Sequence, residues 1–210
     1  MFESAIDNAV LRLMHELFAK ESVAARFYQA GGTALALLRG HRRSVDIDLF
    51  ATEPFDEESI VRLVSGHEGV ILARDRGTVH GLVGTVRVSF LHYPYPLLRP
   101  EIRLDTIRLA SIDDIAAMKV VAVSQRAEKK DFFDMHEILK TMSAAQVKAA
   151  TIGKFGSAQI NCYHALRSFF FFFDDAEDSP DPISLNGTTW PQVKTWFQQH
   201  ERELTSALLC

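Results

Sequence analysis

The sequence predicts an α/β (α+β) fold, in which a short mixed sheet flanked by helices is followed by a helical C-terminal region. Two patterns predict this fold. Apolar and polar residues alternate with period two at several places between residues 45 and 92, which is typical of half-buried strands. Apolar residues recur at helical spacing before and after that stretch. We therefore expect a strand-containing core over residues 1–108 and a helical region over residues 109–210 that packs on it.

Composition limits the classes of protein. The chain has 210 residues, of which 47% are hydrophobic and 24% are charged, so it can bury a core. A net charge of −4 argues against coating nucleic acid through bulk charge, although a local basic patch remains open. Two cysteines, Cys162 and Cys210, are too few for a disulfide framework, and no spacing indicates zinc. Without a signal-like start or an 18-residue apolar run, we expect a reduced, soluble, cytoplasmic protein with no membrane partner.

The first elements are predicted from helical periodicity. Residues 3–20 are expected to form a helix, a second helical turn follows near residues 21–25, and residues 27–30 form a short strand. The apolar face of the first helix consists of Val10, Leu11, Met14, Leu17 and Phe18. The short strand delivers the chain to a pair of glycines.

Gly31 and Gly32 lack a Cβ, so the backbone can turn sharply there and approach a ligand closely. Thr33 is the expected N-cap of a helix over residues 34–39, and Gly40 is the expected left-handed C-terminal cap. A helix N-terminus behind two glycines offers free N–H groups and a partial positive charge, which suit a phosphate. An ordinary turn is the alternative, because glycine pairs before helices are common.

Two carboxylates follow on a predicted strand. Val45, Ile47 and Leu49 alternate with Asp46 and Asp48, so period two places both aspartates on one face. Like charges about 5 Å apart cost roughly 3 kcal/mol at an effective dielectric of 20, and a divalent cation reverses that sign. Mg²⁺ prefers one or two carboxylates together with substrate phosphate oxygens. The alternative is a solvated strand face, but aspartate is disfavoured in strands.

These two stretches resemble the first two motifs of nucleotidyltransferases of the DNA polymerase beta superfamily, and AbiEii-type toxins of bacterial toxin–antitoxin systems most of all. The resemblance implies that the glycine turn holds a nucleoside triphosphate and that Asp46 and Asp48 bind Mg²⁺ and act in catalysis. It also implies a nucleotidyltransferase core at the N-terminal side of the chain. The nucleotide-binding residues expected on this basis are Gly31, Gly32, Thr33, Arg42, Arg43, Ser44 and Lys119.

Further strands are predicted over residues 70–73, 78–82 and 85–92, after a helix that Asp56 opens. In the wider superfamily a neighbouring strand supplies a third carboxylate that helps to activate the attacking hydroxyl. Ser89 occupies the position expected for it here, and serine cannot act as a base of that kind. Glu101 or Asp105 could substitute, but no spacing requires it, so the general base stays open.

Lys119 is the only charge in the predicted helix over residues 115–123, which Ser111 and Asp114 open in a capping-box pattern. It lies among apolar neighbours, so it needs an anion or must extend its ammonium to solvent. The spacing between Asp113 and Lys119 resembles the third AbiEii motif. On that resemblance Lys119 contacts triphosphate oxygens and acts in catalysis.

Asp131 and Asp134 lie three residues apart, which makes them neighbours on a helix face. Aspartates at a helix start commonly cap it or favour its dipole. The pattern Lys130-Asp131-Phe132-Phe133-Asp134 also resembles the fourth AbiEii motif. There the first aspartate supports catalysis, either as the base or by orienting the lysine, so Asp131 is a further candidate catalytic residue.

The C-terminal part is predicted to be helical over residues 143–176, with a break near residues 153–156, and again from Trp190 to about Leu209. Five consecutive phenylalanines at positions 169–173 would surround a helix axis, so this segment is expected to be buried or to face a partner.

The resemblance implies Mg²⁺-dependent transfer of a nucleoside monophosphate from an NTP to an acceptor hydroxyl. An RNA acceptor is expected, with the tRNA 3′ end as the specific candidate, in a toxin that a separate antitoxin neutralises. Two alternatives stay open: a small-molecule nucleotidyltransferase that modifies, for example, an aminoglycoside, and a non-catalytic nucleotide-binding module, which Ser89 suggests. An RNA acceptor would favour a basic groove. The residues expected to line such a groove are Arg39, Arg42, Arg43, Lys129 and Lys130.

Overall fold

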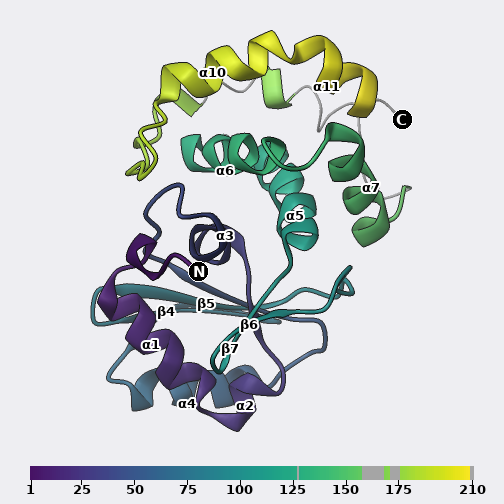
Figure 1. The fold of residues 1–210 in the computed structure, drawn as a ribbon. Coiled ribbons are helices and arrows are strands. Elements are labelled where there is room, and N and C mark those ends of the chain that lie inside the picture. The colour runs from purple at the N-terminus through teal and green to yellow at the C-terminus, as the bar shows by residue number, and fades with distance from the viewer. Residues whose placement is uncertain (127, 158–167, 171–175, 209–210) are drawn as a thin grey trace. The chain divides into compact units, whose positions relative to one another are not determined.

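The computed structural model describes residues 1–126, 128–157, 168–170 and 176–208 (Figure 1). It divides into two compact units. The first contains Met1–Pro96 and Pro100–Ala110, and the second contains Leu97–Arg99 and Ser111–Cys210. The chain therefore enters the second unit briefly at residues 97–99 before it completes the first.

The first unit is built on a seven-stranded mixed sheet in the order β3-β4-β5-β2-β1-β7-β6. Its strands are β1 (Tyr28–Gln29), β2 (Ile47–Ala51), β3 (Val70–Asp75), β4 (Thr78–Val83), β5 (Val86–His92), β6 (Ile102–Leu104) and β7 (Ile107–Leu109). The pairs β2–β5 and β1–β7 are parallel, whereas the other neighbours are antiparallel. The predicted α/β fold with a mixed sheet is thus confirmed, and β6 and β7 are additional to the predicted strands.

The helices of the first unit cover both faces of this sheet. They are η1 (Glu3–Ala5), α1 (Asn8–Phe18), α2 (Glu21–Ala24), α3 (Gly31–Arg39) and α4 (Glu57–Gly66). The single helix predicted over residues 3–20 is interrupted, because Ile6 is extended and forms a β-bridge with Ser44. Helices α1, α2 and α4 lie on one side of the sheet and α3 lies on the other (Figure 1).

Contacts of Gly81 in β4 identify the face that α4 covers. A Cβ added to Gly81 would lie 2.9 Å from Cγ1 of Val64 in α4, so this side of β4 packs directly on the helix. Successive strand residues point to opposite faces, so His80 points away from α4. Gly81 pairs with Val88 of β5, and Val88 pairs with Ile47 of β2, so all three residues lie on the face that α4 covers. Both Ile47 and Val88 are buried.

Helix α3 starts earlier than the sequence predicts. The expected helix over residues 34–39 with Thr33 as N-cap is wrong at its N-terminal end, because the helix begins at Gly31 and Ala30 is the N-cap. Thr33 lies within the first turn, where its hydroxyl bonds outside the helix. At the other end, Gly40 adopts φ 64° and ψ 18°, which confirms the left-handed cap.

The named elements of the second unit, among the residues described, are all helices. They are α5 (Ile112–Gln125), α6 (Lys129–Leu139), α7 (Ala144–Phe155), α10 (Trp190–Gln199) and α11 (Glu201–Leu208). Gly156, at φ 80°, follows α7. The last predicted helix is divided at His200. The ring nitrogen Nδ1 of His200 lies 2.8 Å from the carbonyl oxygen of Trp196.

The phenylalanine run is described only in part. Phe169 is buried and its ring stacks on Phe197 at a centroid distance of 5.7 Å, which fits the expectation of burial. Phe171, Phe172 and Phe173 lie outside the described residues, as do Cys162 and Cys210. In the part of the chain that is described, no helix combines the length and apolar character that crossing a membrane would need.

Asp114 is the polar centre of the second unit. Its side chain is fully buried, Oδ1 accepts from Lys154 Nζ at 2.8 Å and from the Leu98 N–H at 3.0 Å, and Oδ2 accepts from Ser111 Oγ at 2.6 Å. The Ser111 hydroxyl in turn accepts from the Asp114 N–H, as the predicted cap requires. This carboxylate thus joins the start of α5 to α7 and to residues 97–99.

Replacing Asp114 with alanine is expected to lower the free energy of unfolding by about 3–5 kcal/mol, because it leaves the Lys154 ammonium buried without a counter-charge. Both tryptophans lie in α10, so urea unfolding followed by tryptophan fluorescence reports on this unit. Asp113→Ala is the matched control. Its side chain is 35% exposed and pairs with the exposed Arg99, so a loss of about 1 kcal/mol or less is expected. Equal losses in both variants would contradict the assignment of Asp114.

Candidate active site

The first turn of α3 lies against the aspartate strand. A Cβ added to Gly31 would lie 3.3 Å from Oδ2 of Asp48, and Gly31 has φ 67°, a conformation that favours glycine. The N–H of Ala30 donates to the Asp48 carbonyl at 3.2 Å. The Asp48 carboxylate and the N-terminus of α3 are therefore immediate neighbours. The N-cap residue is alanine, whose side chain cannot cap the first-turn N–H groups, and N–H groups at a helix N-terminus are suited to bind an anion.

Gly32 makes room for an arginine. A Cβ at this position would lie 2.2 Å from Nη2 of Arg42, so the guanidinium occupies the space that any other residue would fill. Arg42 is only 4% exposed, and its Nη1 donates to the Arg43 carbonyl at 3.0 Å. A buried guanidinium beside a helix N-terminus adds a second source of positive potential for a phosphate.

Thr33 holds the segment that leads into β2. Its buried hydroxyl lies 2.9 Å from Ser44 Oγ and also bonds to the carbonyl oxygen of Asp46. A hydroxyl carries one proton, so the bond to Asp46 uses it and Ser44 then donates to Thr33. Thr33 and Ser44, both predicted to bind nucleotide, thus fix the backbone at Asp46.

Asp46 and Asp48 flank Ile47 at the start of β2. Ile47 and Leu49 are fully buried, whereas both aspartates are half-buried, as expected if the carboxylates share the more open face. Their oxygens are hard ligands that fit Mg²⁺. Among the described residues, no group of three or more histidine, cysteine or acidic side chains is arranged to hold a metal ion. A cation at this pair would therefore complete its coordination with phosphate oxygens and water.

Ser89 lies directly beside Asp48, because the parallel register of β2 and β5 pairs the two residues. The proposed substitutes for a third carboxylate are placed differently. Glu101 forms two hydrogen bonds of 2.6 Å with Arg108, and Asp105 lies in the turn between β6 and β7 with φ 50°. Strands β6 and β7 are on the other side of β1 from β2. Neither acid is therefore adjacent to Asp48 in the sheet.

Lys119 and Asp131 come together in the second unit. The Lys119 ammonium lies 2.7 Å from Asp131 Oδ1 and 2.5 Å from Asp134 Oδ2, and all three side chains are almost completely buried. Lys119 does not extend to solvent, which excludes the alternative of an ammonium at the surface. Arg126 adds bonds of 2.9 and 3.2 Å to the two oxygens of Asp131.

The electrostatics of this cluster bear on the role of Asp131. Burial by itself would raise the pKa of Asp131, but Lys119 and Arg126 outweigh it and hold that pKa below the ordinary value. A carboxylate with a lowered pKa is a weak proton acceptor. Asp131 is therefore better suited to orient Lys119 than to act as general base. Asp134 and Arg126 are not among the predicted site residues. The signal that could have identified them is helical spacing, because Asp134 is three residues from Asp131 and Arg126 is seven residues from Lys119.

The remaining basic residues are partly engaged elsewhere. Arg43 lies 3.6 Å from Asp7 at the surface, Lys129 lies 2.8 Å from Asp181, and Lys130 lies 2.8 Å from Glu128. Arg42 is buried. Three of the five cations expected to line a basic groove therefore have acidic partners, and the groove itself stays a prediction.

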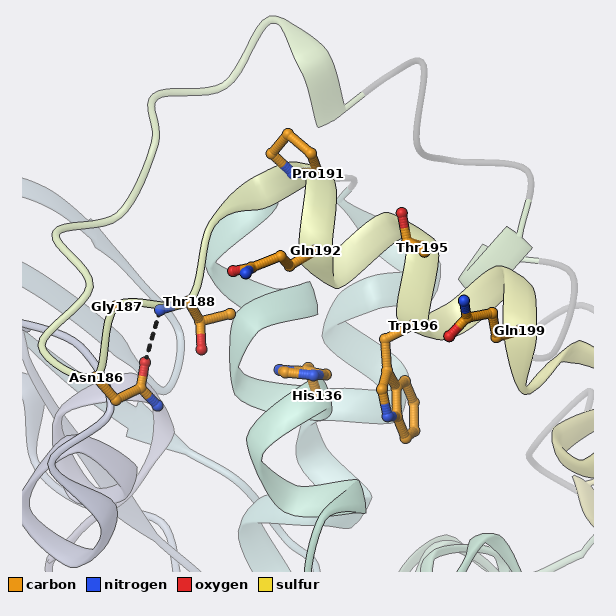
Figure 2. A pocket seen from close by; sticks show the side chains of 9 residues that line it. All are labelled: His136, Asn186, Gly187, Thr188, Pro191, Gln192, Thr195, Trp196 and Gln199. Carbon is orange, nitrogen blue, oxygen red and sulfur yellow. Dashed lines mark hydrogen bonds between the residues drawn. The ribbon is translucent and has the colours of Figure 1, made fainter.

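The second unit also contains an open cavity of about 570 Å³ between α6 and the segment that leads through α10. Figure 2 shows the His136 ring and the Trp196 indole in this cavity, with amide and hydroxyl side chains around them. Its lining residues are His136, Asn186, Gly187, Thr188, Pro191, Gln192, Thr195, Trp196 and Gln199. None of the predicted site residues lines it.

Comparison with known proteins gives a family match. The model of the family described as "Nucleotidyl transferase AbiEii toxin, Type IV TA system" matches residues 12–185. A protein of Aquifex aeolicus (strain VF5), named "Uncharacterized protein aq_aa25", is 34% identical over 182 residues, which cover 84% of this chain and 87% of that protein.

Solved structures share the fold at low identity. JHP933 from Helicobacter pylori is similar at a TM-score of 0.55 and 14% identity, with 96% of this chain and 95% of that chain covered. MenT4, a nucleotidyltransferase toxin from Mycobacterium tuberculosis H37Rv, gives 0.50 and 15%, with 94% and 90% covered. ANT(2″)-Ia in complex with adenylyl-2″-tobramycin gives 0.55 and 14%, with 69% and 95% covered.

Gly32→Ala is expected to weaken NTP binding about tenfold, equivalent to about 1.4 kcal/mol, because the new Cβ displaces the Arg42 guanidinium. An equilibrium titration with a fluorescent NTP analogue measures the effect. Gly66→Ala is the matched control, since a Cβ there meets nothing within 4 Å and affinity should not change. An unaltered dissociation constant in Gly32→Ala would remove Arg42 from the binding site.

Asp131→Asn is expected to destabilise the protein at pH 6 and much less at pH 3. The folded-state pKa of Asp131 is lowered, so its stabilising effect is present above the unfolded value of about 4 and is lost as pH falls through the folded value. Urea unfolding of both proteins at pH 6, 4 and 3, followed by tryptophan fluorescence, gives the difference at each pH. A difference that stays constant across this range would contradict the assigned ion pairs.

Proposed function

Because the chain belongs to the AbiEii nucleotidyltransferase toxin family and is a nucleotidyltransferase, we propose that it transfers a nucleoside monophosphate from an NTP to a hydroxyl of RNA. The proposed acceptor is the tRNA 3′ end, and the proposed cofactor is Mg²⁺. Membership of a toxin family implies an NTP substrate and an antitoxin partner.

The observation that carries this proposal is the approach of the α3 N-terminus to Asp48. An anion-binding turn and a metal-binding carboxylate side by side are the two parts that a nucleoside triphosphate with its cation needs. Gly31 allows this approach, because it has no side chain to separate the helix from Oδ2 of Asp48.

In the proposed reaction, the first-turn N–H groups of residues 31–33 and the Arg42 guanidinium hold the triphosphate. Asp46 and Asp48 hold Mg²⁺, which supplies charge neutralisation at the phosphate oxygens when bound. The acceptor hydroxyl attacks the α-phosphorus, and pyrophosphate leaves. Thr33 and Ser44 keep the backbone of Asp46 in place, so their role is to position the site. Arg43 borders the same segment and is proposed to contact phosphate or acceptor.

Lys119 is proposed to contact triphosphate oxygens, as the family resemblance implies. Its ammonium is held by Asp131 and Asp134, which fix its position. We assign Asp131 to the orientation of Lys119, because the lowered pKa of this carboxyl makes it a poor base.

Asp48→Ala is expected to reduce nucleotidyl transfer at least 1,000-fold, in keeping with loss of a metal-ion site, without unfolding the protein. The measurement is incubation with radiolabelled NTPs, Mg²⁺ and total RNA, followed by separation of labelled products. Asp75→Ala is the matched control, because this exposed aspartate lies at the end of the edge strand β3.

The outcomes of this assay distinguish between the possible acceptors, and they also test the metal assignment and the catalytic role. Labelled RNA that requires Asp48 supports the proposal, whereas a labelled small molecule in a cell extract would favour modification of a drug-like acceptor, the reaction that adenylyl-2″-tobramycin indicates for ANT(2″)-Ia. Full turnover by Asp48→Ala would overturn the metal assignment. Nucleotide binding without transfer would indicate a non-catalytic module.

A further inference from the structure

Three polar side chains form one row across the sheet. The parallel pairing of β2 with β5 places Ser89 opposite Asp48, and the antiparallel pairing of β5 with β4 places His80 opposite Ser89. Residues paired in this way project from the same face of a sheet. All three are half-buried, so the row is open to a ligand within the first unit.

The orientation of His80 is fixed by its neighbours. Gly81, the next residue, packs on Val64 of α4, so His80 projects from the opposite face, where Asp48 also lies. In its row, His80 is flanked by Ser89 on β5 and by Ala73 on β3. Along β4, the residues on the same face are Thr78 and Leu82. All four of these immediate neighbours are uncharged.

His80 and Ser89 form a hydrogen bond that engages one of the two ring nitrogens. The distance from His80 Nδ1 to Ser89 Oγ is 3.0 Å. When Nδ1–H donates to the serine, the lone pair of the neutral imidazole lies on Nε2. This is the arrangement of a histidine held by a polar partner on one nitrogen and able to accept a proton on the other.

The carboxylates considered for the role of general base are poorly suited to it. Glu101 is bound by Arg108, Asp105 lies at the far edge of the sheet, and Asp131 is surrounded by Lys119 and Arg126. His80 differs from all three, since it lies in the same row as a proposed metal ligand. Neighbouring strands are about 4.8 Å apart, so His80 and Asp48 are separated by about 10 Å along the row.

We propose that His80, oriented by Ser89, is the general base that accepts the proton of the attacking hydroxyl. This inference rests on the proposed nucleotidyl transfer. The acceptor oxygen forms a bond to the α-phosphorus, and the bond from that phosphorus to the bridging oxygen breaks. The electron pair of the broken bond leaves with pyrophosphate, and the hydroxyl proton passes to Nε2 of His80. His80 then returns the proton to solvent. Ser89 thus stands in the expected carboxylate position as a positioning residue.

The test uses single-turnover transfer to RNA by the full chain, with the NTP dissociation constant measured in parallel. His80→Asn keeps an N–H that can reach Ser89 but has no counterpart of Nε2. It is expected to lower the single-turnover rate about 100-fold, within the range for loss of a general base, with NTP affinity unchanged. Ser89→Ala should lower the rate by a smaller factor. His92→Asn is the matched control, because His92 is three residues from Ser89 and projects from the other face.

Chemical rescue separates a catalytic role from a structural one. Added imidazole should restore part of the transfer rate of His80→Ala and should leave wild type and Asp48→Ala unchanged. A His80→Asn rate within twofold of wild type, in an enzyme that still requires Asp48, would overturn the role of His80 alone. Absence of rescue in a folded, NTP-binding His80→Ala would also overturn it. Absence of any transfer by wild type would overturn the proposed function and this inference together.

Discussion

The first unit depends on the absence of side chains at Gly31 and Gly32. At Gly31 the first turn of α3 approaches the carboxylate of Asp48, and at Gly32 the helix leaves space for the guanidinium of Arg42. A helix N-terminus, an arginine and an aspartate are thereby concentrated at one end of β2. The hydroxyl of Thr33 then fixes the loop that leads to Asp46. The polar groups that the first unit contributes to the proposed triphosphate site are positioned relative to this turn.

The second unit contains buried ion pairs. It buries the ammonium groups of Lys119 and Lys154, and each has an equally buried carboxylate partner. Buried ion pairs contribute little net stability, but loss of one partner is costly. Both pairs join helices that are separate in sequence: α5 to α6 through Lys119, and α5 to α7 through Asp114. The packing of α5 is therefore specified by charge as well as by its apolar surface.

Much of this arrangement could be predicted from local sequence. Period-two alternation predicts the aspartate strand and the strands β3, β4 and β5. Gly40 predicts the end of α3. The start of α3 was missed because threonine after two glycines is also a good N-cap, and only the tertiary bond to Asp46 shows its other use. Strands β6 and β7 have three residues each, which is too short for periodicity to indicate.

His80 could not be predicted as a site residue. Its proximity to Ser89 depends on the register of two antiparallel strands, and its relation to Asp48 depends on a parallel pairing between segments about 40 residues apart in sequence. A shift of one residue in either register would reverse the face on which it lies. The ion pairs of Lys119 were within reach of sequence, since Asp131 and Asp134 are neighbours on a helix, but the burial of all three groups was not.

The route of the chain between the two units affects how the protein can be divided. The backbone passes between them three times, after Pro96, after Arg99 and after Ala110, and the short excursion is anchored by the bond from the Leu98 N–H to Asp114. A truncation after residue 110 would therefore keep a three-residue piece of the second unit without its anchor. A fragment that begins at residue 111 would in turn leave Asp114 without the N–H of Leu98, so a cut at this boundary removes a native bond from both halves.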